Sequence, residues 1–190
     1  MRMLAFFEYG AVLLGVIAIA AGSFFHAPRA MHIGIFLIGA GIALAGAESV
    51  FTREPGFRFR SGAGTAYQGA PAVIWGLMLL LTGSALIAWS YLQSRGLAAG
   101  VLAQLARRPA PVLAAGGLLS LGAGAILLFN PGGDRGIWRA LLVTVPRSLL
   151  GAALALAGIA AVGAGLWEWL DPQAFGRAAR ALGLPPRLLP

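Results

Sequence analysis

The sequence predicts an all-α integral membrane protein, a polytopic bundle of about five transmembrane helices with one or two amphipathic interfacial helices. Composition is the first observation behind this fold class. Hydrophobic residues make up 59% of the 190 residues and charged residues only 11%, whereas soluble domains are about a quarter charged. The second observation is length, because five apolar segments reach the roughly 20 residues that a helix needs to cross a bilayer. An ordinary soluble enzyme and a nucleic-acid-binding domain are excluded.

The five predicted spans lie within residues 1–170, which we expect to form one helical bundle. Their ranges are 4–25, 31–51, 71–92, 111–129 and 147–170. The first segment resembles a secretory signal, with a basic residue before an apolar stretch, but it is longer than such a stretch and carries Glu8. We therefore interpret it as a retained span.

Two segments outside the spans are predicted to be interfacial helices. In residues 93–110, apolar side chains recur at helical spacing between arginines, which is typical of a helix lying in the headgroup region. Residues 171–190 form a basic interfacial tail, in which Asp171 is a predicted N-cap and Pro172 the first helical residue. The 14 basic residues are all arginines and divide seven against seven between the two sides, so the positive-inside rule assigns no orientation.

Glycines spaced by seven recur in every span. This spacing keeps one stripe of a helix facing a neighbour, and small residues allow the close backbone approach that joins helices inside a membrane. The predicted packing positions are Gly15, Gly22, Gly39, Gly46, Gly69, Gly76, Gly83, Gly117, Gly124, Gly151, Gly158 and Gly165, and Gly34 and Gly41 form a further pair. We hypothesise that at least one stripe docks against a partner; the alternative is that all of them pack within the chain.

Two acidic residues inside the spans are candidates for proton or counter-ion chemistry. Glu8 in the first span and Glu48 near the end of the second belong to antiparallel neighbours, so we expect them at similar depth on the same side. Two close carboxyls share a proton, which is how a proton-uptake site would begin. In the alternative interpretation both lie at the interface with Arg2 or Arg53 as counter-ions.

The chain has two histidines and no cysteine, which excludes thiolate chemistry and covalent haem attachment. His26 and His32 flank the first short link. One interpretation is a structural role or a contact with lipid headgroups, and the other is that a single histidine ligates a chlorophyll or haem. No other metal site and no other cofactor is predicted, whereas bound lipid is expected.

Several arginines are candidates for contacts with lipid headgroups or with a partner protein. Arg58 and Arg60 alternate with aromatic residues in the loop at 52–70. The others lie in the two interfacial segments and are Arg107, Arg108, Arg177 and Arg180. The net charge of +8 fits anionic lipid or an acidic partner better than nucleic acid.

These features favour a non-catalytic accessory subunit of a larger integral-membrane complex of respiratory, photosynthetic or transport type. Its expected partners are membrane lipids and other membrane subunits, with self-association open, and its expected location is the bacterial inner membrane. No enzymatic activity is expected, because no convergent acid, base or metal set is present. The alternative is a small homo-oligomeric transporter or channel.

Residues 117–131, GLLSLGAGAILLFNP, resemble a hairpin of the small bacterial acid-resistance membrane proteins of the HdeD type. The resemblance covers one hairpin, and the number of spans in that family differs from the five predicted here. It therefore implies no function for this chain.

Overall fold

A computed structural model describes residues 2–54, 69–129 and 144–181, with the side chains of 2–5 excepted. The described residues are helical and contain no strand, so the all-α fold class is confirmed. Five helices are long and apolar enough to cross a membrane. The helices are α1 (Arg2–Phe24), α2 (Pro28–Thr52), α3 (Ala70–Ser94), α4 (Ala98–Arg107), α5 (Ala110–Phe129), α7 (Val145–Leu170) and α8 (Pro172–Ala181).

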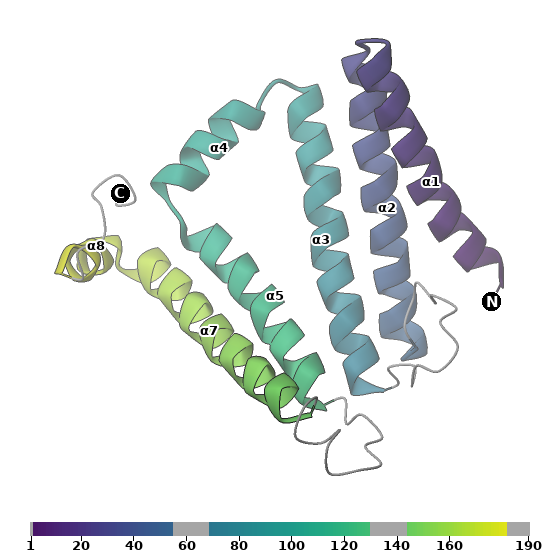
Figure 1. Cartoon of the computed structure of the whole chain (residues 1–190). Coiled ribbons are helices and arrows are strands. Elements are labelled where there is room, and N and C mark those ends of the chain that lie inside the picture. Colours follow the sequence, from purple (N-terminus) through teal and green to yellow (C-terminus); the bar gives the residue numbers. More distant parts are fainter. Residues whose placement is uncertain (1, 55–68, 130–143, 182–190) are drawn as a thin grey trace. The chain divides into compact units, whose positions relative to one another are not determined.

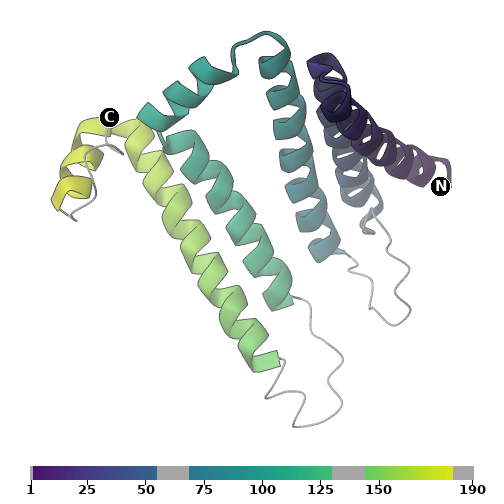
Figure 2. The ribbon, with the colours of Figure 1, turned by 45° about the horizontal axis from the view of Figure 1, so that its top comes forward.

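The chain divides into two compact units, Met1–Ala98 (unit 1) and Ala99–Pro190 (unit 2). In unit 1, α2 packs against both α1 and α3, so the three long helices run in alternating directions with α2 in the middle (Figure 1). In unit 2, α5 and α7 form an antiparallel hairpin, and α8 follows α7 at its end (Figure 2).

Four of the long helices have a proline at their start. α2, α3, α5 and α7 each have a proline in the first two helical positions, where its missing N–H costs no hydrogen bond. Pro28 therefore opens α2, whereas we predicted it to lie in the link and the span to start at residue 31. The link itself is tight, and His26 takes a left-handed backbone conformation with φ of 52°.

Both predicted amphipathic segments contain a helix. α4 lies inside the segment at 93–110 and leaves Arg107 and Arg108 exposed. α8 begins as predicted, because Asp171 Oδ1 accepts a hydrogen bond from the Ala174 N–H at 2.9 Å, which is the geometry of an N-cap. Their position at a membrane interface remains a prediction.

The distribution of side chains is the reverse of that in a soluble protein. Among the residues that the structure describes, the buried hydrophobic ones are four alanines and Ile126. Large apolar side chains lie outside instead, among them Leu14 on α1, which is 59% exposed, and Leu156 on α7, which is 68% exposed. Helices that meet through small residues and expose large apolar ones are suited to hydrocarbon, in which exposed leucine costs nothing.

Candidate functional site

Glycines bring the three helices of unit 1 into backbone contact. A Cβ added to Gly15 would lie 2.7 Å from the Gly34 carbonyl oxygen on α2. On another face of α2, a Cβ added to Gly46 would lie 2.7 Å from the Gly76 oxygen on α3. In the same way, a Cβ added to Gly83 on α3 would lie 2.6 Å from the Gly39 carbonyl oxygen on α2. α2 thus has two glycine stripes, one for each neighbour.

The hairpin of unit 2 repeats this arrangement. A Cβ on Gly117 would lie 2.8 Å from the Gly158 oxygen, and one on Gly124 would lie 2.6 Å from the Gly151 oxygen. A Cβ added to Gly165 would lie 2.9 Å from the Ala110 carbonyl oxygen at the start of α5. Real Cβ atoms do not approach backbone so closely, so only glycine permits this spacing of α5 and α7.

Two of the predicted packing glycines differ from the others. Gly22 lies at the α1 end, where an added Cβ would meet the Met31 backbone nitrogen at 2.8 Å. Gly69 is not a packing residue, and our prediction for it is wrong. It precedes α3 with φ of 74° and has nothing within 4 Å of an added Cβ. Glycine is needed at this position because other residues rarely adopt a positive φ.

The structure brings Glu8 and Glu48 together. Glu8 is 1% exposed, and its carboxyl lies close enough to the half-buried Glu48 for the two side chains to interact. Glu8 Oε1 is buried and has no hydrogen-bond partner. Within the described residues, no arginine pairs with either carboxyl, and Arg53 instead ends α2 in a left-handed conformation. The side chain of Arg2 lies outside the described part.

A third acidic residue has a different role. Glu168, near the end of α7, is 2% exposed, and its Oε2 accepts a hydrogen bond from the Ala110 N–H at 2.7 Å. A helix start carries unpaired N–H groups and partial positive charge, so a carboxylate there stabilises α5. The structure thus buries this side chain as a cap supplied by the neighbouring helix.

Two serines, which the sequence analysis did not assign to a site, link neighbouring helices. Ser90 Oγ on α3 donates to the His32 carbonyl oxygen on α2 at 2.7 Å. Ser120 Oγ on α5 donates to the Leu154 carbonyl oxygen on α7 at 2.8 Å. Among the described residues, each unit therefore contains a hydroxyl that donates a hydrogen bond across a helix pair.

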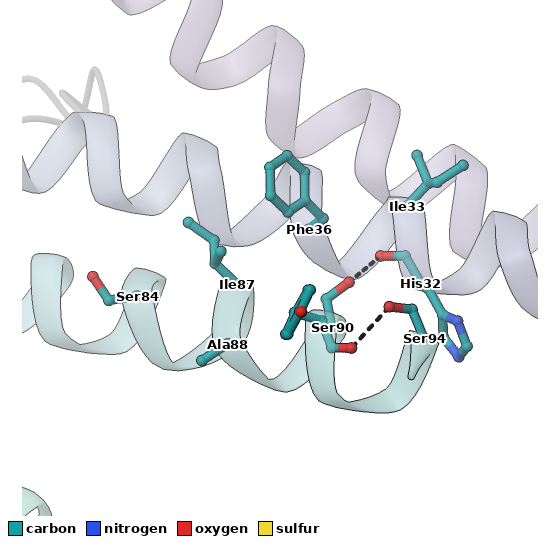
Figure 3. Close-up of a pocket in the computed structure, with 9 residues that line it drawn as sticks. His32, Ile33, Phe36, Ser84, Ile87, Ala88, Ser90 and Ser94 are labelled. Atoms are coloured by element: carbon teal, nitrogen blue, oxygen red, sulfur yellow. Dashed lines mark hydrogen bonds between the residues drawn. The ribbon is translucent and has the colours of Figure 1, made fainter. Parts of the chain in front are cut away.

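The two histidines are not close to a common ligand position. His26 is exposed in the link, whereas His32 lines a groove of ≈ 580 Å³ on α2 and α3 (Figure 3). Apolar side chains line most of it. Ser94, which also lines the groove, donates a hydrogen bond from its Oγ to the Tyr91 carbonyl oxygen of its own helix. Single-histidine ligation of chlorophyll or haem stays a prediction for both residues.

The predicted headgroup arginines are exposed where the structure describes them. Arg177 and Arg180 lie on α8, and the Arg180 Nε donates to the Gly176 carbonyl oxygen at 3.1 Å. Arg58 and Arg60 lie outside the described residues. No cluster of three or more histidine or acidic residues suited to a metal ion occurs in the described ranges.

No protein-family model matches the chain, and no curated protein or solved structure matches it. The resemblance at residues 117–131 gains no support from these comparisons. The two units and their buried polar groups are therefore the basis for any functional conclusion.

Proposed function

We propose that the chain is a non-catalytic subunit of a larger integral-membrane complex, with lipids and other membrane subunits as its partners. The observation that carries the proposal is that several polar groups of the described spans are used inside their own unit. Ser90 and Ser120 bond to neighbouring helices, and Glu168 caps α5. Side chains used in this way hold helices together, which suits a scaffold, whereas Glu8 Oε1 and Arg147 Nε are buried without a hydrogen-bond partner.

The surface available to a partner is apolar and bulky. Seven-spaced glycines in the described helices face neighbours of their own unit, so a partner would meet other residues. This weakens our hypothesis that a glycine stripe docks a partner. Side chains such as Leu14 and Leu156 point outward and suit either acyl chains or the transmembrane helices of another subunit.

The bacterial inner membrane is the proposed location. Five membrane-length apolar helices support insertion into a membrane, and the excess of arginine suits anionic headgroups. The exposed arginines of α4 and α8 are proposed to contact these headgroups or an acidic partner, and bound lipid is expected around both units.

Site-specific photo-crosslinking tests the accessory role. A photoreactive amino acid replaces Leu14 or Leu156 in the full chain in native membranes, and replaces the fully buried Ala45 as the matched control. We expect the two exposed positions to crosslink to the same integral-membrane proteins that co-purify in fixed stoichiometry, and the control to give no such product. Crosslinks to lipid alone, or to further copies of this chain alone, would contradict the accessory role.

The Glu8–Glu48 pair favours a second candidate, a small homo-oligomeric transporter or channel. Ionisable groups held inside a membrane commonly mark ion or proton pathways. Purified chain in liposomes with a trapped pH-sensitive dye would show proton flux that Glu8→Gln abolishes. Absence of flux in the intact protein would rule out proton transport by this pair.

A further inference from the structure

The buried Glu8 carboxyl lacks a hydrogen-bond donor among the described side chains. Ionised carboxylates accept hydrogen bonds and cannot donate them. Glu8 is 1% exposed, its Oε1 has no hydrogen-bond partner, and Glu48 is the neighbouring carboxyl that acts on it. Two ionised carboxylates in such a buried contact would repel each other, so the burial and the missing donor favour a proton bound to the pair.

The helices beside the pair pack closely. α1 packs on α2, and Ala45 on that helix is fully buried. A Cβ added to Gly41 would lie 2.9 Å from the Glu8 carbonyl oxygen, so the two backbones nearly touch beside the pair. Among the described side chains, Glu48 on α2 and Tyr9 on α1 are the titratable groups that interact with Glu8. Neither of them supplies a positive charge.

The pair lies near one end of the two helices that carry it. Glu8 lies six residues from the start of α1, which corresponds to about 9 Å of helix. Glu48 lies four residues before the end of α2, or about 6 Å. The pair is therefore near one end of both spans, while Glu8 itself is closed to solvent.

We propose that Glu8 and Glu48 form a proton-binding site that holds one shared proton between α1 and α2. Loss of this proton would leave two carboxylates facing each other in an apolar contact, which repel. This proposal concerns the same pair as the transporter candidate of the proposed function. It does not require transport, because a pair can bind a proton without passing it across the membrane.

Dicyclohexylcarbodiimide, an apolar reagent for protonated carboxyls, is the probe. The carboxyl O–H adds across one C=N bond, so the oxygen bonds to the central carbon and the proton moves to nitrogen. The acyl group then migrates from that oxygen to the other, unprotonated nitrogen, and no atom leaves. The adduct adds the mass of one reagent molecule, and peptide mass spectrometry locates it in the chain.

The experiment treats the full chain in phosphatidylcholine liposomes over a pH series, in sodium chloride and in choline chloride. Glu168 is the internal control, since it is equally buried and its Oε2 accepts a hydrogen bond from the Ala110 N–H. We expect one adduct per chain, at Glu8 or Glu48, and none at Glu168. Labelling should fall about tenfold per pH unit above its midpoint, as for a single proton.

Four results would overturn the proposal: no adduct at either residue, an adduct whose yield ignores pH, labelling of Glu168 to the same extent, or protection by sodium at constant pH. The last result would indicate a metal ion in place of the proton. Labelling without proton flux would refute the transporter candidate alone, so the two failures are distinguishable.

Discussion

Replacing Gly158 by alanine should separate α5 from α7. The added Cβ would lie 2.5 Å from the Leu121 backbone nitrogen and 2.7 Å from the Gly117 carbonyl oxygen. Ordinary contacts begin at 3.4 Å, so the backbones must move apart by about 0.9 Å near this point. No side-chain rotation can relieve a clash with backbone atoms.

The expected cost of this variant is about 1–3 kcal/mol, the usual range for overpacking a close contact. A gap of this size also forfeits roughly a quarter to a half of the dispersion energy of the contacts that it opens. Gly163→Ala is the matched control, because Gly163 is in the same helix and has nothing within 4 Å of an added Cβ. Both variants gain the same helix propensity, so that term cancels.

Reversible unfolding by SDS in mixed micelles, followed by tryptophan fluorescence, measures the difference. We expect Gly158→Ala to unfold at a lower SDS fraction than the parent chain and Gly163→Ala to unfold at or above the parent midpoint. Coincident curves for the two variants would refute the claim that close backbone contact holds this hairpin together.

Three further substitutions test single hydrogen bonds. Ser90→Ala should destabilise unit 1 by about 0.6 kcal/mol, the average for a hydrogen bond between membrane helices, as measured by the same SDS titration. Glu168→Ala leaves the first amide of α5 without its acceptor and should cost about 1 kcal/mol, seen as a lower thermal midpoint. Asp171→Ala removes the α8 cap and should speed amide hydrogen exchange in α8 several-fold without changing exchange in α5.

The helices were predictable because hydropathy and proline mark their ends. The α5 and α7 ranges differ from the predicted spans by one or two residues at their starts. The larger difference is at α2, where Pro28 starts the helix instead of belonging to the link. A proline suits both a link and a first helical turn, so its presence alone does not separate the two.

The glycine spacing identified the stripes but not their partners. Gly34 with Gly41 and Gly39 with Gly46 are both visible in the sequence, yet only the structure assigns the first pair to α1 and the second to α3. A period of seven defines a helix face and contains no information about which neighbour covers it.

The polar contacts of the helix pairs were the least predictable part. Ser90, Ser120 and Glu168 bind backbone groups, which every residue has, so the sequence contains no complementary residue to search for. The contact between Glu8 and Glu48 was easier to anticipate, because two antiparallel helices joined by a short link place residues of equal membrane depth side by side.

Disulfide crosslinking tests the central claim, that glycine stripes join helices within each unit, most directly. The chain has no cysteine, so introduced pairs need no background mutation. A Cβ on Gly41 would lie 3.3 Å from the Ala11 Cβ, and one on Gly165 would lie 3.3 Å from the Leu113 Cβ. A cysteine at either glycine also meets a backbone oxygen at 2.9 Å, so the helices must part by about 0.5 Å to reach an ordinary contact of 3.4 Å. That shift brings both Cβ–Cβ separations into the roughly 3.5–4.5 Å of disulfides.

Double cysteine variants at 11 with 41 and at 113 with 165 should therefore oxidise readily in membranes. Controls move one cysteine to the adjacent residue, Gly10, where an added Cβ meets nothing, or the half-exposed Leu166. The account predicts rapid intramolecular disulfides in the first two variants and slow or no reaction in the controls. Equal rates in variants and controls, or disulfides formed only between chains, would contradict it.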